Sequence, residues 1–182
     1  MELKINRGTL LAVLECRSSI KNPRPYLCGI CFRQNGRIVA TDGHILAYAR
    51  HENEIDRDLI LSVGKLPTRN FEYAEFDTGQ GIVRLFDKQN NLIGATHCSE
   101  IDGTYPNIDR VIQEAESAEN NGVFEIAFAT RYLLKLERMT KYINPTNPVI
   151  KIKTTTATSA ALCNISNSTG ESVSVMIMPV RI

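Results

Sequence analysis

Residues 26–49 read YLCGICFRQNGRIVATDGHILAYA, and this stretch contains two turn signals between apolar runs. Asn35-Gly36 is the strongest short hairpin signal, because both residues tolerate the backbone angles of a tight turn. Asp42-Gly43 marks a second turn. The stretch therefore predicts antiparallel strands at residues 26–32, 37–40 and 44–49.

The segment upstream predicts a strand followed by a helix. Residues 2–6 alternate between polar and apolar side chains, as in a short half-buried strand. Asn6 can cap a helix over residues 9–16, where the apolar side chains share one face. The first fifty residues thus predict one unit made of a strand, a helix and three further strands.

The same order of elements recurs less clearly in the next segment. Strands are predicted at residues 59–63, 71–76, 82–86 and 92–98. The segment 65–69 has the position of the helix in the first unit. It is short and contains Pro67, so at most a fragment of a helix is predicted there.

A third unit follows residue 122. Thr130 can cap a helix over residues 131–142, and Pro145 and Pro148 lie beyond its end. Strands are predicted at residues 123–128, 149–155, 159–165 and 173–180. Three such units predict an α+β fold, in which helices lie on one side of antiparallel sheets.

A polar stretch separates the third unit from the first two. Residues 113–122 contain few apolar side chains, and they fit either a linker or a short solvated helix. With the linker interpretation, the expected organisation is a domain over residues 1–113, a linker over 114–122 and a smaller unit over 123–182.

Composition limits the classes of function. The chain has 182 residues, 43% of them hydrophobic, and a net charge of +1. Near-neutrality argues against a generally basic nucleic-acid binder, although it allows a basic strip on one face. No stretch approaches the roughly 20 apolar residues of a membrane helix, and no leader begins the sequence. We therefore expect a cytoplasmic protein without a membrane partner.

The cysteines and histidines do not predict a metal or cofactor site. Cys28 and Cys31 have the spacing of half a zinc site, but His97 and Cys98 are adjacent and cannot supply the other half. Five cysteines within mostly apolar runs are typical of reduced core thiols. The sequence therefore predicts neither a bound metal nor a cofactor.

An enzymatic alternative can be constructed from scattered residues. Asp42, His44 and His97 would form a hydrolytic site, with Cys16 or Ser99 as the nucleophile. The sequence contains no nucleophile elbow, phosphate loop or paired metal motif. The favoured expectation is a protein that is not an enzyme.

Four stretches resemble the beta subunit of bacterial DNA polymerase III, the sliding clamp. Residues 24–32, RPYLCGICF, resemble the family's Arg-x-Tyr-Leu-x-Gly-x-x-Phe run, and residues 39–47, VATDGHILA, are very similar to its Val-Ala-Thr-Asp-Gly-His-Arg-Leu-Ala signature. Residues 103–112, GTYPNIDRVI, and residues 175–182, VMIMPVRI, resemble two further family motifs. The four stretches also follow the family's order along the chain.

The resemblance implies a DNA-clamp-like fold in truncated form. Residues 1–113 match the family's middle domain, and residues 123–182 match the second half of its C-terminal domain. Clamp domains contain two strand–helix–strand units each, so the three predicted units agree with one domain and a half.

The resemblance also implies a pocket for short peptide segments between these two parts. Partners would be a DNA polymerase or other proteins that carry a clamp-binding motif with a Gln and two or three apolar residues. The pocket residues carried over are Leu27, Thr41, Gly43, His44, Leu46, Pro106, Arg110, Val111, Met176, Met178, Pro179, Val180 and Arg181.

Two positions depart from the family pattern, and one segment has a simpler explanation. Ile45 stands where the family often has Arg, and Met176 replaces a smaller apolar residue. Taken alone, the alternation of Met178, Val180 and Ile182 would also fit an ordinary edge strand.

Clamps encircle double-stranded DNA without reading its sequence, and the third helix has side chains suited to that role. Its basic residues fall at spacings of three and four and so line one stripe. They are Arg131, Lys135, Arg138 and Lys141. With three units per chain, a ring of twelve units would need a homo-oligomer of four chains.

Two functions therefore remain open. The chain is either a processivity factor that tethers a polymerase to DNA, or a non-ring module or decoy that captures clamp-binding peptides.

Overall fold

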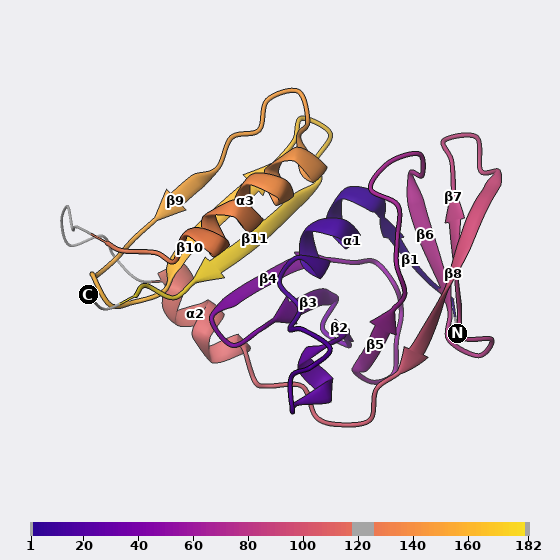
Figure 1. Cartoon of the computed structure of the whole chain (residues 1–182), viewed down its shortest axis with the longest axis horizontal. Helices are drawn as coiled ribbons and strands as arrows, with labels where there is room; N and C mark the ends of the chain where they lie inside the picture. Colours follow the sequence, from indigo (N-terminus) through magenta and orange to yellow (C-terminus); the bar gives the residue numbers. More distant parts are fainter. Residues whose placement is uncertain (1, 118–125, 181–182) are drawn as a thin grey trace.

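The computed structural model describes residues 2–117 and 126–180, and its strands form one antiparallel sheet (Figure 1). The sheet has eleven strands in the order β1-β6-β7-β8-β5-β2-β3-β4-β11-β10-β9. In that order the strands are Glu2–Asn6, Tyr73–Asp77, Ile82–Phe86, Leu92–Glu100, Leu59–Val63, Ile30–Arg33, Arg37–Thr41, Ile45–Arg50, Ser172–Ile177, Ala161–Ser166 and Lys151–Lys153.

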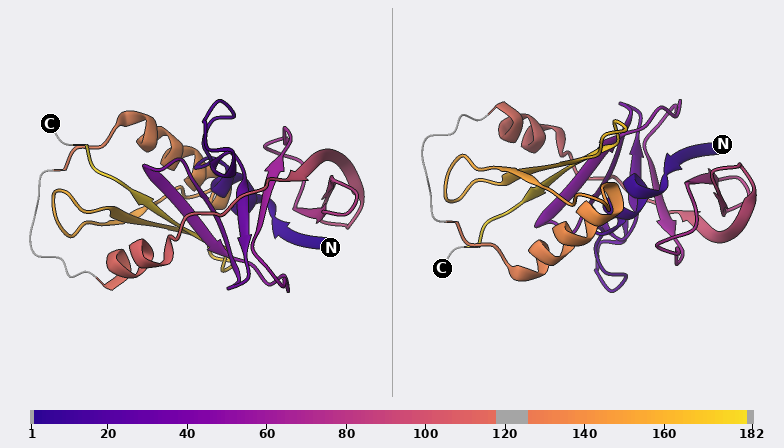
Figure 2. Two further views of the ribbon diagram at one scale, coloured as in Figure 1. Left: turned by 90° about the horizontal axis from the view of Figure 1, so that it is seen from below. Right: turned by 90° about the horizontal axis from the view of Figure 1, so that it is seen from above.

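Helices cover both faces of the central strands. The helices are α1 (Arg7–Leu14), the short 3-10 helix η1 (Pro25–Leu27), α2 (Asp109–Ser117) and α3 (Thr130–Ile143). α1 and α3 pack against each other on one face, and α2 lies on the opposite face (Figure 2). Ala47 and Ala49 of β4 face α1 and α3, whereas Leu46 and Tyr48 face α2, because successive side chains point to opposite faces.

Covering both faces explains the sequence of β4. Its first five residues, 45–49, are all buried, so the strand is apolar throughout instead of alternating. Among the described strands, the edge strand β9 pairs with β10 alone, and it exposes Lys151 and Ile152.

The first and third units share one hydrophobic core. β4 pairs with β11 from Ile45↔Ile177 to Tyr48↔Ser174. On the face covered by α1 and α3, Leu10 of α1 and Met139 of α3 are fully buried in the same cluster. The structure therefore joins the residues before and after the predicted linker in one packed body.

A carboxylate from the third unit completes the start of α1. Asn6 stands at the cap position, but its side chain makes no capping hydrogen bond. Instead, the backbone N–H and the hydroxyl of Thr9 both donate to Glu171 Oε1 at 2.7 Å. A Cβ on Gly8 would lie 2.8 Å from the same carboxylate oxygen and from the Tyr142 carbonyl, so this approach requires glycine.

The α+β prediction with antiparallel strands is confirmed, while several element boundaries were wrong. The strand predicted at 26–32 begins only at Ile30, because Pro25 starts η1. Residues 65–69 form no helix, so the second unit lacks one. The strands predicted at 149–155 and 173–180 are shorter than expected and span 151–153 and 172–177.

The segment around the predicted linker also differs. Residues 113–117 are helical as part of α2, which agrees with the alternative interpretation, and residues 118–122 lie outside the described residues. Of the strand predicted at 123–128, residues 126–128 are not in a strand and the rest is outside the description. The boundary itself stays a prediction.

The shared core makes a prediction about stability. Met139→Ala should lower the free energy of unfolding by about 2–5 kcal/mol, because the side chain is fully buried between α1 and the sheet. Urea denaturation followed by circular dichroism measures this change. Leu134→Ala on the same helix is the control, since Leu134 is 61% exposed and its loss should cost about 0.5 kcal/mol or less. Equal effects of the two changes would contradict the shared core.

Candidate functional site

The structure brings the C-terminal tail beside the predicted turn. Met176 pairs with Leu46 in the β4–β11 ladder. One step further, the Met178 backbone N–H donates to the His44 carbonyl at 2.9 Å, and Val180 N–H donates to the Ala127 carbonyl at 2.8 Å. We call residues 41–46 together with 176–180 the tail–turn site.

The turn is fixed by its own side chains. The Asp42 carboxylate accepts from the backbone N–H groups of His44 at 3.0 Å and Ile45 at 3.1 Å. Thr41 Oγ1 accepts from Gly43 N–H at 3.0 Å and donates to the Ile45 carbonyl at 2.8 Å. Gly43 has a φ of +96°, a conformation that favours glycine. These contacts hold His44 outward at the tip of a defined turn.

The second predicted wall lies on α2 and the segment before it. Ile112 and Ala115 are buried in one cluster with Leu46 and Met176, so α2 sits over the β4–β11 junction. Arg33 and Arg37 hold the start of α2 through Asp109, at 3.2 and 3.1 Å.

The other end of α2 is anchored through Tyr48. Its hydroxyl donates to Glu116 Oε1 at 2.8 Å. Burial, and then the hydrogen bond to the Glu116 carboxylate, raise the pKa of Tyr48 to about 12, so the phenol stays protonated. The cross-sheet contacts at both ends of α2 therefore fix its position over the junction.

Some of the predicted pocket residues are buried, and the others are at least partly exposed. The side chains of Leu27, Thr41, Leu46 and Met176 are buried. The remaining described members are exposed or half-buried: Gly43, His44, Pro106, Arg110, Val111, Met178, Pro179 and Val180. Arg181 lies outside the described residues.

Residues that the pocket prediction missed adjoin the turn. The His44 and Tyr132 rings stack with centroids 6.4 Å apart, and Lys135 Nζ lies 3.3 Å from Asp42 Oδ2. The Arg131 guanidinium lies 4.8 Å from the Tyr132 ring centroid. The regular spacing of the α3 cations indicated a stripe suited to DNA phosphates, and no sequence signal linked these cations to the turn.

The four cations of the predicted DNA-binding stripe on α3 contact different groups within the chain. Arg131 and Lys135 face the tail–turn site, Arg138 lies 3.6 Å from Glu15, and Lys141 pairs with Glu137. The core of α1, residues 8–13, is buried and offers no basic face beside this stripe.

The structure separates His97 and Ser99 from the other residues of the enzymatic alternative. Asp42 and His44 belong to the turn before β4, whereas His97 and Ser99 lie on β8. Three strands separate β8 from β4, which amounts to about 19 Å at the usual strand spacing. Within residues 2–117 and 126–180, no three His, Cys, Asp or Glu side chains group to hold a metal ion.

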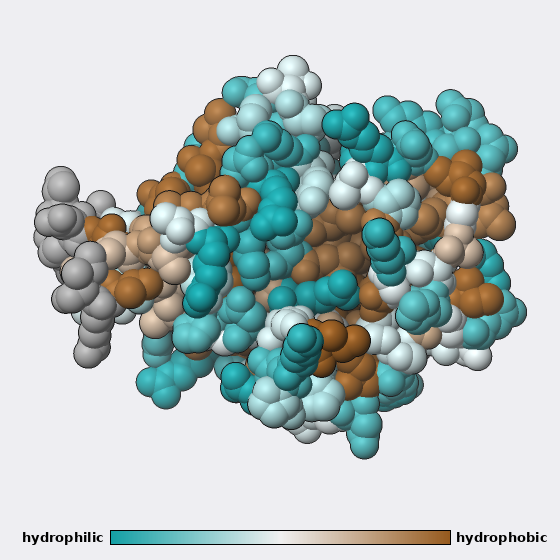
Figure 3. Space-filling model, viewed as in Figure 1, coloured by the Kyte–Doolittle hydropathy of each residue, from teal (hydrophilic) through white to brown (hydrophobic). Residues whose placement is uncertain are grey.

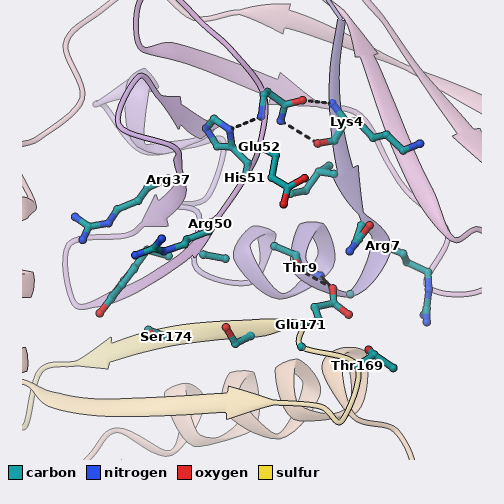
Figure 4. A pocket seen from close by; sticks show the side chains of 18 of the residues that line it. Lys4, Arg7, Thr9, Arg37, Arg50, His51, Glu52, Thr169, Glu171 and Ser174 are labelled. Carbon is teal, nitrogen blue, oxygen red and sulfur yellow. Dashed lines mark hydrogen bonds between the residues drawn. The ribbon is translucent and has the colours of Figure 1, made fainter.

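A polar hollow of about 960 Å³ opens at the opposite end of the β4–β11 ladder (Figure 4). Its walls come from β1, the start of α1, the segment after β4 and the turn before β11. Charges of both signs line it, including Arg50, Glu52, Glu72 and Glu171. Sequence patterns did not indicate this hollow, because its walls are brought together only by the fold.

The cysteines make a prediction about reactivity. Burial raises the pKa of Cys16 far above its ordinary value, and it raises the pKa of Cys31 and Cys163 to about 12. Only Cys28 is not buried. Ellman's reagent should therefore titrate one thiol rapidly at pH 8 and the other four only in denaturant. Cys28→Ser should abolish the rapid phase, and rapid reaction of two or more thiols would contradict the assignment.

Comparison with protein-family models and with curated proteins finds no match. Solved structures of sliding clamps do match. The DNA polymerase sliding clamp of Pseudomonas aeruginosa aligns with a TM-score of 0.62 at 17% identity, covering 100% of this chain and 67% of that one. The Caulobacter crescentus beta sliding clamp gives 0.60 at 20% identity, and the H. pylori beta clamp gives 0.62 at 13%, each with 100% and 66% coverage.

Identities of this size establish the fold and nothing finer. Among the described helices, none is both long and apolar enough to cross a membrane. The chain spans about two thirds of the length of the clamps it matches. Over that span it has the fold of the bacterial sliding clamps.

Proposed function

We propose that this protein is a clamp-like module that binds short peptide motifs of replication and repair proteins at the tail–turn site. The observation that carries the proposal is the pairing of the tail with the turn, which places Met178 beside His44. Described residues from the three stretches that resemble clamp motifs, at 39–47, 103–112 and 175–180, pack in one cluster with Leu46 and Met176.

The exposed side chains suit a short apolar segment. Met178 is 42% exposed, Val180 47% and Val111 42%. Methionine adapts its shape to different partners, and a few apolar anchors typically dominate such contacts. A terminal segment with two or three apolar residues would bind with micromolar affinity, about −8 kcal/mol.

The two edges of the sheet favour a module over a ring that encircles DNA. Asn53 occupies the free edge of β1, because its amide both accepts from Lys4 N–H at 2.6 Å and donates to Lys4 C=O at 2.9 Å. The other free edge, β9, has Lys151 and Lys153, and lysines on an edge strand oppose pairing with a second sheet.

A DNA polymerase or another protein with a clamp-binding motif would supply the segment, and the module would compete for it or modulate its use. The five free cysteines suit the reducing cytoplasm. A processivity factor is the second candidate, supported by the clamp fold itself.

Peptide binding can be tested at one exposed side chain. Met178→Glu should weaken binding of a fluorescent Gln-Leu-x-Leu-Phe peptide at least about tenfold, because it places a charge in the apolar contact. Fluorescence anisotropy measures the dissociation constant. Leu92→Glu is the control, since Leu92 is 58% exposed on β8, away from the site. Binding that survives Met178→Glu unchanged would contradict the proposal.

The state of association separates the two candidate functions. Because one sheet edge is occupied and the other carries lysines, light scattering should give the mass of a single chain at micromolar concentration. The chain should also show equal affinity for circular and linearised plasmid. A stable tetramer that is retained on circular DNA but lost after linearisation would instead establish a ring.

A further inference from the structure

Asn53 occupies the outer edge of β1 as a neighbouring strand would. Among the described strands, β1 pairs only with β6. On its other side, the Asn53 amide oxygen accepts from the Lys4 N–H at 2.6 Å, and the amide nitrogen donates to the Lys4 carbonyl at 2.9 Å. A residue of a paired antiparallel strand would use the same two backbone groups. A single side chain outside any strand therefore blocks this edge of the sheet.

His51 fixes the backbone that carries this amide. The Asn53 N–H donates to His51 Nδ1 at 3.2 Å, and His51 Nε2 lies 3.2 Å from the Arg33 carbonyl oxygen. Figure 4 shows the hydrogen bonds that connect His51 with Lys4 through the residue between them. Because Nδ1 accepts a hydrogen bond, it carries no proton, and Nε2 is the nitrogen that donates. This contact therefore exists only while the imidazole is neutral.

The surroundings of His51 favour its neutral form. The residue is 8% exposed, and its ring centroid lies 5.4 Å from that of Phe32. Burial lowers the pKa of His51, although contacts with backbone groups partly oppose this effect. A proton on the buried ring would add a charge in a place that is largely removed from water.

The charged groups around the ring do not provide a partner for an imidazolium. Arg33 pairs with Asp58 at 3.3 Å and with Asp109 at 3.2 Å. Within residues 2–117 and 126–180, no carboxylate forms an ion pair with His51. The charged side chains on the elements around the ring are Lys4 on β1, Arg33 on β2, Arg37 on β3, Arg50 on β4, Asp109 on α2, and Glu52, Glu54, Asp58 and Glu72 on the connecting segments.

β1 is complementary to a second copy of itself. Leu3 points into the core, whereas Glu2 and Lys4 are exposed. The Lys4 backbone groups point away from β6, because they reach Asn53, and those of Glu2 point the same way by alternation. Two antiparallel copies of β1 centred on Leu3 therefore set Glu2 of each chain opposite Lys4 of the other. Both pairs join opposite charges across the strands, which stabilises such a contact.

The end of the molecule that holds β1 and β6 to β8 has a mixed surface. On the face shown in Figure 3, hydrophilic residues separate the hydrophobic groups at this end. Lys4 Nζ lies 3.7 Å from the Tyr73 ring centroid, so the chain itself covers this aromatic ring. Association at this end would therefore depend on backbone pairing and on the charges of β1.

We propose that Asn53 blocks the β1 edge only while His51 is neutral, and that protonation of His51 releases Asn53 so that two chains pair through their β1 strands. An imidazolium carries a proton on Nδ1, so the ring would point a donor at the Asn53 N–H and lose this hydrogen bond. Because burial lowers the pKa of His51, the block holds at neutral pH and is lost as the pH falls through that lowered pKa. The uncovered edge of a strand is a template for another chain, and a second copy of β1 matches it.

Light scattering at about pH 7.5 and about pH 5 tests this block. The wild-type protein should have the mass of one chain at the higher pH and of two chains at the lower pH. Asn53→Ala should associate at both, because the amide that covers Lys4 is removed. His51→Gln should stay a single chain at both, since an uncharged amide can accept from the Asn53 N–H at low pH. Glu54→Ala is the matched control, because Glu54 is exposed in the same segment, and it should behave as the wild type.

The register of the paired strands has a separate test. In the Asn53→Ala background, Glu2→Lys should weaken association at least about tenfold, because the added positive charge faces Lys4 of the other chain. Adding Lys4→Glu should restore association, since the opposite charges are then exchanged and not lost. Sedimentation equilibrium measures the dissociation constants.

Three results would overturn the proposal. They are a wild-type dimer at about pH 7.5, a single-chain Asn53→Ala protein with a native circular dichroism spectrum, and equal association of His51→Gln and the wild type at about pH 5. If Asn53→Ala does not fold, Asn53→Asp takes its place, because it keeps an acceptor for the Lys4 N–H but loses the donor to the carbonyl, and it should also associate. This inference does not rest on peptide binding at the tail–turn site, which these variants should leave unchanged.

Discussion

The antiparallel pairing of β4 with β11 is the interaction on which the rest of this structure depends. It is the only ladder that joins the first eight strands to the last three within the described sheet. It also places the tail at the turn, and it creates the junction that α2 covers on one face and the α1–α3 pair covers on the other. A change in its register by one residue would turn every side chain of β11 to the wrong face.

The two faces of this junction have different tasks. On the face covered by α1 and α3, fully buried residues such as Leu10 and Met139 supply the hydrophobic stabilisation. On the α2 face, ion pairs from Arg33 and Arg37 to Asp109 position a helix that buries few of its side chains. The surface near the tail, with Met178 and Val180, is left exposed.

Much of the fold followed from local signals, because tight turns and alternation are short-range properties. Asn35-Gly36 and Asp42-Gly43 marked both turns of the first meander correctly. The helix over residues 113–117 was harder to predict, since it depends on the apolar sheet surface beneath Ile112 and Ala115. In the candidate site, too, some residues could be predicted from local sequence and others depend on tertiary packing. Family motifs indicated the turn and the tail, but the contacts of Tyr132 and Arg131 arise from tertiary packing that no spacing reveals.

The bond between Thr9 and Glu171 spans 162 positions of the chain. During synthesis the first turn of α1 therefore lacks its carboxylate partner until residue 171 has been made. The apolar side chains of α1 likewise stay uncovered until α3, Thr130–Ile143, has been made. Contacts this distant in sequence slow folding, and apolar surface that is exposed meanwhile is prone to aggregation.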